Sequence, residues 1–471
     1  MTAITQALSE FAAHLSYAGL PQAVSERAKL LILDTVGIAL RARYEAASTP
    51  SLLAAVAKLG MDHGKAAVIG MEHGFTPPAA AWLNGAFAHS LDFDDTHARS
   101  SLHPSAPIVP AALAAAEMVG ASGREVIAAV VAGYETQIRL SLALVPKDHY
   151  TRGFHPTATC GVFGAAAAAG RIFGLNAAQI ASAFGICLSQ TAGSMQFLKD
   201  GAWTKLFQVG YAAMNGLIAA RLAGEGFKGA AEALEGKAGF LASFAPNPIP
   251  ENAIAGLGDR YETLMIAVKP YPSCRYTHAG LDGLLALRAA YDIDPVEVEA
   301  VEVGLPRTGW NIVGNPLEAK HHPHNVVDGQ FSMPFVAAVA LREGRMGWDD
   351  YATHIKDPAT LALGKRVDVV VDPRAEAEFP AQMSAAVRIR TGRGEFERFV
   401  KIPKGEPENF LNIEELRAKF DSLVAPYLSD ARAEELAGAL LSLDHVNDIS
   451  ALLKLTRASH GQARRHAPQA E

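Results

Sequence analysis

Apolar positions recur at helical spacing from the start of the chain to about Val268, with breaks at glycine or proline. The segment 28–40 is apolar on more than one face, which is typical of a helix buried among other helices. Asp34 lies inside it, so we expect this carboxylate to cap or hydrogen-bond a neighbouring element. The same spacing predicts further helices over 106–119, 123–144, 159–173, 177–194 and 203–223.

Between Lys269 and about Lys401 the pattern changes to the alternation of β-strands. The predicted strands are 296–303, with a bulge where the alternation slips out of phase, 367–371, and the hairpin 386–390 and 395–400 around Thr391-Gly392-Arg393-Gly394. Helical spacing returns at Asn412, whose side chain can cap a helix together with Glu415, and continues through Leu455.

These patterns predict a mainly α fold with two domains. The expected domains are a large all-helical domain from residues 1–268 and 402–456 and a smaller α+β domain from residues 269–401. The polar tail 457–471 is expected to be disordered.

Composition and charge narrow the classes of function. The 471 residues are 49% hydrophobic, which supplies at least one large core. A formal net charge of −7 offers no basic surplus to attract a phosphate backbone, so nucleic acid is not an expected partner. Cys160, Cys187 and Cys274 are an odd number without CxxC spacing, which indicates reduced thiols.

No segment has the pattern of a targeting or membrane sequence. Residues 1–20 lack the basic start, apolar block and cleavage site of a signal peptide. The longest apolar stretches, such as 126–133 and 160–170, are far shorter than the roughly 20 residues that span a bilayer. We therefore expect a soluble, cytoplasmic protein without a membrane partner.

The densest polar stretch runs from His89 to His97 and is followed by His103-Pro104-Ser105. Carboxylates and imidazoles are costly near a helical core unless they are paired or functional, and a proline after an imidazole fixes the backbone that presents the ring. This stretch is the first candidate for an active-site wall. Four other clusters combine an ionisable group with rigid neighbours: 153–157, 203–207, 269–274 and 321–324.

Taken without any relative, these clusters have a structural interpretation. His103 and His155 would cap helices and be held by the prolines that follow them, and Lys205 and Lys269 would pair with surface carboxylates. The case for function therefore depends on the clusters occurring together and in order.

In the residues of these motifs and in their order along the chain, the protein resembles the MmgE/PrpD family, which includes 2-methylcitrate dehydratase, cis-aconitate decarboxylase and iminodisuccinate epimerase. The resemblance spans nearly the whole chain and is carried by Leu33-Asp34-Thr35-Val36-Gly37, the segment 92–104, Phe154-His155-Pro156-Thr157, Lys205 before Gly210, and Lys269-Pro270-Tyr271-Pro272-Ser273-Cys274. It implies a large helical domain built from both ends of the chain, a smaller α+β lid, a homodimer and a pocket between the domains.

The resemblance also implies the residues of the active site, which are Asp92, Thr96, His103, His155, Lys205 and Lys269. Reactions of this family form or quench a carbanion next to a carboxylate, so negative charge builds on carboxylate oxygens. Lys205 and Lys269 would stabilise that charge and bind substrate, and His103 and His155 would act as acid and base. Asp92 and Thr96 would orient a ring or the substrate.

A metal site is a possible alternative function of this region. Oxygen and nitrogen ligands are offered by Asp92, Asp94, Asp95, His97 and the stretch 321–324. A calcium loop beginning at Asp92 would require glycine at its sixth position and an acidic residue at its twelfth, where this chain has His97 and His103. No HExxH motif occurs. We expect neither a metal nor a cofactor.

Two features bear on the substrate. Trp310 appears where the resemblance places a pocket tyrosine of cis-aconitate decarboxylase, and its single N–H donor would change the hydrogen bonding to that substrate. His321, His322 and His324 would either bind a substrate carboxylate or, as we favour, form a solvated loop.

The function expected from the sequence is a lyase, 2-methylcitrate dehydratase-like, that acts on a small di- or tricarboxylate by proton transfer next to a carboxylate. Two alternatives stay open, an epimerase of a dicarboxylate such as iminodisuccinate and a cis-aconitate-type decarboxylase. A non-catalytic helical binding module is a further alternative of a different class.

Overall fold

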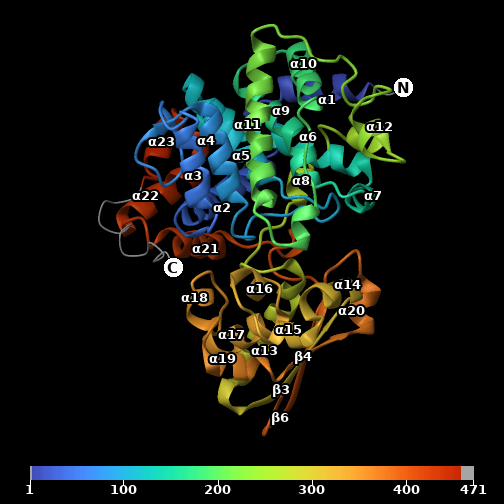
Figure 1. Cartoon of the computed structure of the whole chain (residues 1–471), viewed down its shortest axis with the longest axis vertical. Coiled ribbons are helices and arrows are strands. Elements are labelled where there is room, and N and C mark those ends of the chain that lie inside the picture. The colour runs from blue at the N-terminus through green and yellow to red at the C-terminus, as the bar shows by residue number, and fades with distance from the viewer. Residues whose placement is uncertain (1–2, 458–471) are drawn as a thin grey trace. The chain divides into compact units, whose positions relative to one another are not determined.

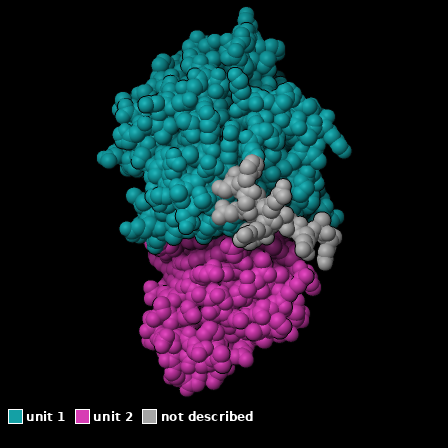
Figure 2. Space-filling view, turned by 90° about the vertical axis from the view of Figure 1, so that its left-hand side faces the viewer, with its two compact units in different colours: residues 1–268, 412–471 teal, residues 269–411 magenta. Residues whose placement is uncertain are grey.

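This computed structural model describes residues 3–457. Backbone contacts divide the chain into two compact units, coloured separately in Figure 2. Unit 1 comprises the chain up to Val268 and from Asn412 onward, and unit 2 comprises Lys269–Leu411. Unit 1 is almost entirely helical, whereas unit 2 combines helices with a four-stranded sheet. The predicted fold class, mainly α with a smaller α+β part, is confirmed.

The long helices of unit 1 pack on one another (Figure 1): α2 (Gln22–Glu45), α4 (Pro77–Ala88), α5 (Ser105–Val119), α6 (Gly123–Leu144), α9 (Gly161–Ile172) and α11 (Thr204–Gly224). Helix α11 packs against both α4 and α9. Gly210 and Gly216 permit these close approaches, because a Cβ at Gly210 would collide with the Trp82 carbonyl of α4 and one at Gly216 would collide with Ala165 of α9. Helix α11 is thereby fixed in place.

Unit 1 has further α-helices and two short strands. They are α1 (Ile4–His14), α3 (Thr49–Lys58), β1 (Ala66–Ala67), β2 (Gly74–Phe75), α7 (Pro146–Thr151), α8 (Pro156–Thr159), α10 (Ala177–Leu188), α12 (Phe240–Phe244), α21 (Ile413–Val424), α22 (Asp430–Leu441) and α23 (Ile449–Lys454). Strands β1 and β2 form a small antiparallel pair.

Two predicted helices have different limits in the structure. The helix expected over 177–194 is α10, which ends at Leu188, and the chain then turns. That turn lets the Gly193 carbonyl accept the backbone N–H of His155 at 3.1 Å. The helix expected over 159–173 is α9, which begins at Gly161 and ends at Ile172. The prediction for α10 fails where the chain makes this non-local contact.

Asp34 and the C-terminal helices behave as the sequence predicts. The Asp34 carboxylate lies 2.6 Å from the ammonium of Lys419 on α21, and both side chains are buried. Asn412 caps α21 and forms a capping box with Glu415. Apart from Arg457, the tail that the sequence predicts to be disordered lies outside the described residues.

Helix α6 is apolar enough, over an 18-residue window of mean hydropathy 1.2, to pass a length and composition test for a membrane span. The sequence analysis considered uninterrupted apolar runs and missed it. In the structure, 94% of that window is buried inside the protein, as in a core helix. Arg139 within α6 pairs with Glu135 at 2.9 Å, so its charge is compensated.

Unit 2 is built on a sheet of strand order β4-β3-β5-β6. Its strands are β3 (Val298–Leu305), β4 (Val367–Val371), β5 (Ala385–Thr391) and β6 (Gly394–Val400). Strand β4 is parallel to β3, the other pairs are antiparallel, and the register shifts between Val298 and Ala300. The predicted bulge and hairpin are therefore confirmed.

The helices of unit 2 include α13 (His278–Tyr291) and α17 (Met333–Glu343), which pack on the sheet and on each other. The remaining ones are α14 (Arg307–Gly309), α15 (Leu317–His321), α16 (Val326–Gln330), α18 (Asp350–His354), α19 (Pro358–Gly364) and α20 (Pro373–Glu378). The sequence predicts that this domain ends at residue 401, one residue after the last strand. Residues 402–411 belong to unit 2 because Lys404 N–H donates to Asp282 and Glu406 pairs with Arg275.

Candidate active site

The polar segment between α4 and α5 is held in one conformation by contacts with distant parts of unit 1. The Phe93 carbonyl accepts a hydrogen bond from the Lys419 ammonium at 3.0 Å, and the backbone of Thr96 pairs with that of Ala267. At its end, the Asp95 carboxylate accepts the backbone N–H of Ser105 at 3.1 Å and so caps α5. Asp92 has a positive φ of 52°, which an aspartate tolerates better than most residues. The segment is therefore a fixed platform for its side chains.

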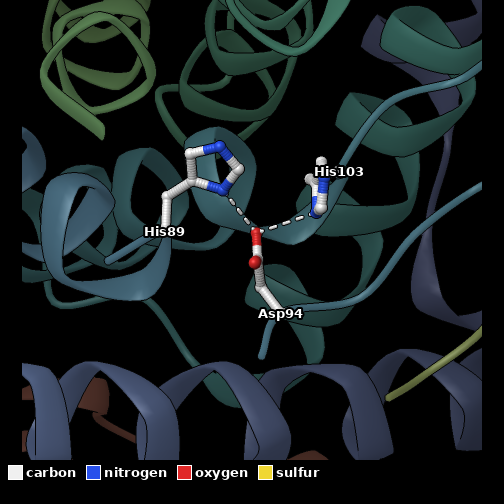
Figure 3. Close-up of side chains that lie close together, drawn as sticks. All are labelled: His89, Asp94 and His103. Atoms are coloured by element: carbon white, nitrogen blue, oxygen red, sulfur yellow. Dashed lines mark hydrogen bonds and ion pairs between the residues drawn. The ribbon is translucent and has the colours of Figure 1, made fainter. Parts of the chain in front are cut away.

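Two imidazoles from this segment meet at one carboxylate (Figure 3). Nδ1 of His89 lies 2.6 Å from Oδ2 of Asp94, and Nδ1 of His103 lies 3.2 Å from the same oxygen. The side chain of His89 is 0% exposed and that of Asp94 is 2% exposed, whereas that of His103 is 16% exposed. His103 is thus the member of this group that a ligand can reach.

His155 joins this group from a different part of the sequence. It is the residue before α8, and its ring stacks on that of His89 with centroids 5.8 Å apart. The ring of His103 also contacts that of His89, edge-to-face, with centroids 4.8 Å apart. The Thr157 hydroxyl accepts the backbone N–H of His103 at 3.1 Å, which ties the two histidine-bearing segments together. His89, Asp94, His103 and His155 are called the imidazole cluster below.

Lys205 supplies a cation beside the cluster. Its Nζ lies 2.8 Å from Oδ1 of Asp92, and its side chain is 28% exposed. Burial disfavours the ammonium, but Asp92 and Asp94 together raise the pKa of Lys205 above its ordinary value. Lys205 therefore stays protonated at neutral pH.

The cluster itself holds one negative charge between neutral rings. Burial disfavours the Asp94 carboxylate, but His103 and His89 hold its pKa well below the ordinary value. Burial lowers the pKa of His89 to about 4, against the pull of Asp94. Burial also lowers the pKa of His155 well below its ordinary value, and His89 and Lys205 act in the same direction. His89 and His155 are therefore neutral near pH 7.

His89, Asp94 and His103 also form a set whose ligand atoms lie within 4.8 Å of one another, as a metal site requires. Ligand atoms held about 2.0–2.2 Å from a tetrahedral zinc are roughly 3.3 Å apart. Nδ1 of His89 and Oδ2 of Asp94 are 2.6 Å apart, which is the separation of a charge-assisted hydrogen bond. The donor set as arranged fits a shared proton better than a metal.

The other acidic and basic groups of this stretch have separate partners. Asp95 accepts hydrogen bonds from Ser105, and His97 contacts Ser100 and Glu262. Thr96 is placed in the segment by its backbone pairing with Ala267. Asp92, which the sequence analysis expected to orient a ring or the substrate, pairs with Lys205.

The predicted site residues of unit 2 are described separately. Lys269 is its first residue, and its assignment rests on the resemblance alone. Trp310 uses its only donor within unit 2, because its indole N–H donates to the Val369 carbonyl at 3.0 Å. His321 contacts the Val367 carbonyl and His322 contacts the Glu318 carbonyl, each at 3.0 Å.

Sequence reasoning missed three members of this arrangement. His89 was noted in the polar stretch without a role, Asp94 was considered only as a metal ligand, and Gln208, which contacts His155 at 2.8 Å, was not noted. Gln208 follows Lys205 by three residues on α11, so helical spacing places both on one face. That spacing was the available signal.

Comparisons with known proteins agree along the whole chain. Residues 6–252 match the MmgE/PrpD N-terminal domain and residues 271–444 match the MmgE/PrpD C-terminal domain. Cis-aconitate decarboxylase of Aspergillus terreus is 28% identical, over 96% of this chain and 95% of that protein. The cis-aconitate decarboxylase-like protein oryM of Aspergillus oryzae is 29% identical over 96% and 97%. Human cis-aconitate decarboxylase is 26% identical over 97% and 95%.

Proposed function

Because this chain belongs to the MmgE/PrpD family, we propose that it is a lyase that acts on a small di- or tricarboxylate by proton transfer at a carbon next to a carboxylate. The observation that carries the proposal is the imidazole cluster with Lys205 beside it. Such a cluster combines a group that can move a proton with a cation that can stabilise a carbanion.

The roles follow from exposure and charge. His103 is the partly exposed imidazole and carries the proton to or from carbon, with Asp94 stabilising its charged form. Lys205 stabilises the negative charge that spreads onto the substrate carboxylate, and Asp92 holds Lys205 in position. His155 is only 2% exposed, and its place at the reacting group is proposed on the resemblance. Lys269 is proposed as a second cation on the resemblance alone.

Dehydration of a hydroxylated substrate such as 2-methylcitrate is the reaction we propose first. Decarboxylation of cis-aconitate is the second candidate, because the relatives that match along nearly the whole chain carry that name. Trp310 favours dehydration over decarboxylation of cis-aconitate. It lacks the hydroxyl of the tyrosine that the resemblance places here in cis-aconitate decarboxylase, and its N–H already donates to Val369.

The test is a substrate panel of citrate, 2-methylcitrate, cis-aconitate, malate and iminodisuccinate with the full chain. A new ultraviolet-absorbing alkene identifies dehydration, released CO2 identifies decarboxylation, and deuterium from heavy water in recovered substrate without an alkene identifies epimerisation. The last outcome would replace the lyase by an isomerase. Thermal stabilisation by these acids without turnover of any would overturn the enzyme and favour a binding module.

The assembly and location expected from the sequence stay predictions. We propose a homodimer, which sedimentation analysis of the purified chain tests directly. The cytoplasmic location and the lid role of residues 269–401 likewise stay predictions.

A further inference from the structure

Gln208 has an amide orientation that its backbone partner determines. Its Oε1 faces the backbone N–H of Ser194 at 2.9 Å, and that group can only donate. The other end of the amide is therefore the NH2 group, and it lies 2.8 Å from Nδ1 of His155 and 3.3 Å from the Ser194 carbonyl. An NH2 group can only donate, so Nδ1 of His155 must accept.

The proton of neutral His155 consequently sits on Nε2. Burial keeps the ring neutral, since it holds the pKa of His155 well below the ordinary value. A neutral imidazole that accepts at one nitrogen carries its hydrogen on the other. His155 thus presents an N–H donor at Nε2.

The opposite holds for His103. Its Nδ1 lies 3.2 Å from Oδ2 of Asp94, an ion-pair approach without hydrogen-bond geometry, and that oxygen already accepts Nδ1–H of His89 at 2.6 Å. Two lone pairs at this distance from each other would repel, so Nδ1 of His103 carries a hydrogen. Nε2 of His103 is then the nitrogen that gains or loses a proton.

We infer that Gln208 and Asp94 are positioning residues that hold His155 and His103 in opposite tautomers. Nε2 of His155 is a permanent hydrogen-bond donor, whereas Nε2 of His103 is the single site of proton exchange. The two histidines are therefore not interchangeable acid and base. The tautomers follow from the contacts alone, and only their catalytic consequence rests on the proposed function.

His89 keeps the two rings apart. The His89 ring stacks on His155 and contacts His103 edge-to-face. Because burial lowers the pKa of His89, the ring between these two partners is neutral near pH 7. Within residues 3–457, no group hydrogen-bonds Nε2 of His89. His89 thus supports the cluster without offering a third exchangeable proton near pH 7.

The proton balance follows for the proposed lyase. In dehydration the C–H bond breaks and the proton goes to Nε2 of His103, where Asp94 stabilises the new imidazolium. The electron pair of that bond forms the C=C bond as the C–O bond breaks, and the His103 imidazolium gives its proton to the leaving hydroxide, which departs as water. In decarboxylation the C–C bond breaks, CO2 leaves, and the electron pair on carbon takes the proton from protonated His103. His155 keeps its proton in both and donates a hydrogen bond to an oxygen that gains negative charge.

The experiment reads the ring nitrogens of the full chain labelled with 15N-histidine, and His103→Asn and His155→Asn variants assign the signals. For the neutral rings, we expect a protonated Nε2 on His155 and a protonated Nδ1 on His103. A wild-type His155 protonated at Nδ1, or a His103 protonated only at Nε2, would overturn the inference. This readout does not require turnover.

Gln208→Glu replaces the donor by an acceptor of nearly the same shape. We expect the His155 proton to move to Nδ1, or the ring to become doubly protonated, and kcat to fall about 10²-fold with KM within a few-fold of wild type. If this variant does not fold, Gln208→Met removes the donor without adding charge, and His155 should then show a mixture of tautomers.

Gln137→Glu is the matched control. Gln137 is a buried glutamine of α6 whose amide donates to the Thr157 carbonyl at 3.2 Å and not to a ring. This substitution adds the same charge, but the His155 signals should keep the wild-type pattern. Equal loss of kcat in both variants with an unchanged His155 pattern would reduce Gln208 to a structural role. An intact tautomer pattern without turnover of any acid would instead refute the proposed function and leave the tautomers standing.

Discussion

Two histidine-rich stretches of this chain have similar composition but different surroundings. In unit 1, the stretch that contains His89 and His103 directs two ring nitrogens at the Asp94 carboxylate. In unit 2, His321 directs a ring nitrogen at a backbone carbonyl. His322 directs one at the Glu318 carbonyl and, at 3.4 Å, at the exposed Glu318 carboxylate. In the sequence, the two stretches share one feature, which is a high local density of histidines with a proline beside them.

The difference lies in what the partner does to the proton. A backbone carbonyl is neutral and only accepts, so it fixes a ring as a donor and does little to stabilise a charged imidazolium. A buried carboxylate fixes the same nitrogen as a donor and also stabilises the ring when it gains a proton. The density of imidazoles thus says less about function than the charge of the group that each ring faces.

The strongest test of this comparison is His103→Ala. We expect kcat to fall by roughly 10²–10⁴-fold, because the exchangeable proton is lost from the reacting carbon. His155→Ala should also lower kcat, since it removes the fixed donor beside the reacting group. Steady-state kinetics on the substrate identified by the panel provides the measurement.

Melting temperatures of both alanine variants show whether the loss is chemical or structural. A melting temperature near that of wild type with lost activity supports the assignment. Full activity in both variants would refute the catalytic role of the cluster.

Lys205→Met is expected to have the next largest effect. It removes the ammonium that meets charge on the substrate and leaves Asp92 without its cation, so kcat/KM should fall by about 10²-fold. Lys205→Arg keeps the positive charge and is the matched control, with a smaller loss. Equal losses in both variants would show that the geometry of Lys205, not its charge, is what matters.

A smaller effect is expected on the pH dependence of stability, through Asp95, the residue after Asp94. Burial raises the pKa of Asp95 to about 8, although hydrogen bonds from Ser105 oppose the shift. The folded chain therefore holds a proton that the unfolded chain releases near pH 4, so this group makes the wild type less stable as pH rises from about 4 to about 8. Asp95→Asn lacks that titration, and its melting temperature should shift upward relative to wild type across this window.

The measurement compares melting temperatures of the wild type and Asp95→Asn at several pH values. Above about pH 8 the difference between them should become constant. Parallel curves from pH 4 to pH 8 would show that Asp95 is ionised in the folded chain, as Asp94 is.

Local rules predicted much of the fold. The capping box at Asn412, the bulge near Val298 and the hairpin of β5 and β6 follow from side-chain spacing and turn chemistry, which act within a few residues. The end of α10 was missed because it is set by a hydrogen bond between Gly193 and His155, far apart in sequence. Periodicity carries no information about such contacts.

The site divides in the same way. His103, His155, Lys205 and Asp92 were named from the sequence, and the structure brings them together in unit 1, but their catalytic roles stay proposals. Gln208 was missed because its importance depends on which atom of His155 it faces. Residue type and order can identify the reacting groups, whereas tautomers require the geometry of their partners.

The smallest expected effect is the sharpest control on the comparison. His321→Ala combined with His322→Ala removes two imidazoles from unit 2, as the His103 and His155 substitutions do in unit 1. His321 contacts a backbone carbonyl, and His322 contacts a backbone carbonyl and the exposed Glu318 carboxylate, a weak surface pair. We therefore expect kcat and KM to stay within about twofold, and stability to fall by only about 1 kcal/mol per lost hydrogen bond. Kinetics and urea unfolding of the double variant provide the measurement. A loss of activity comparable to that of His103→Ala would show that the partner of a ring does not distinguish the two stretches.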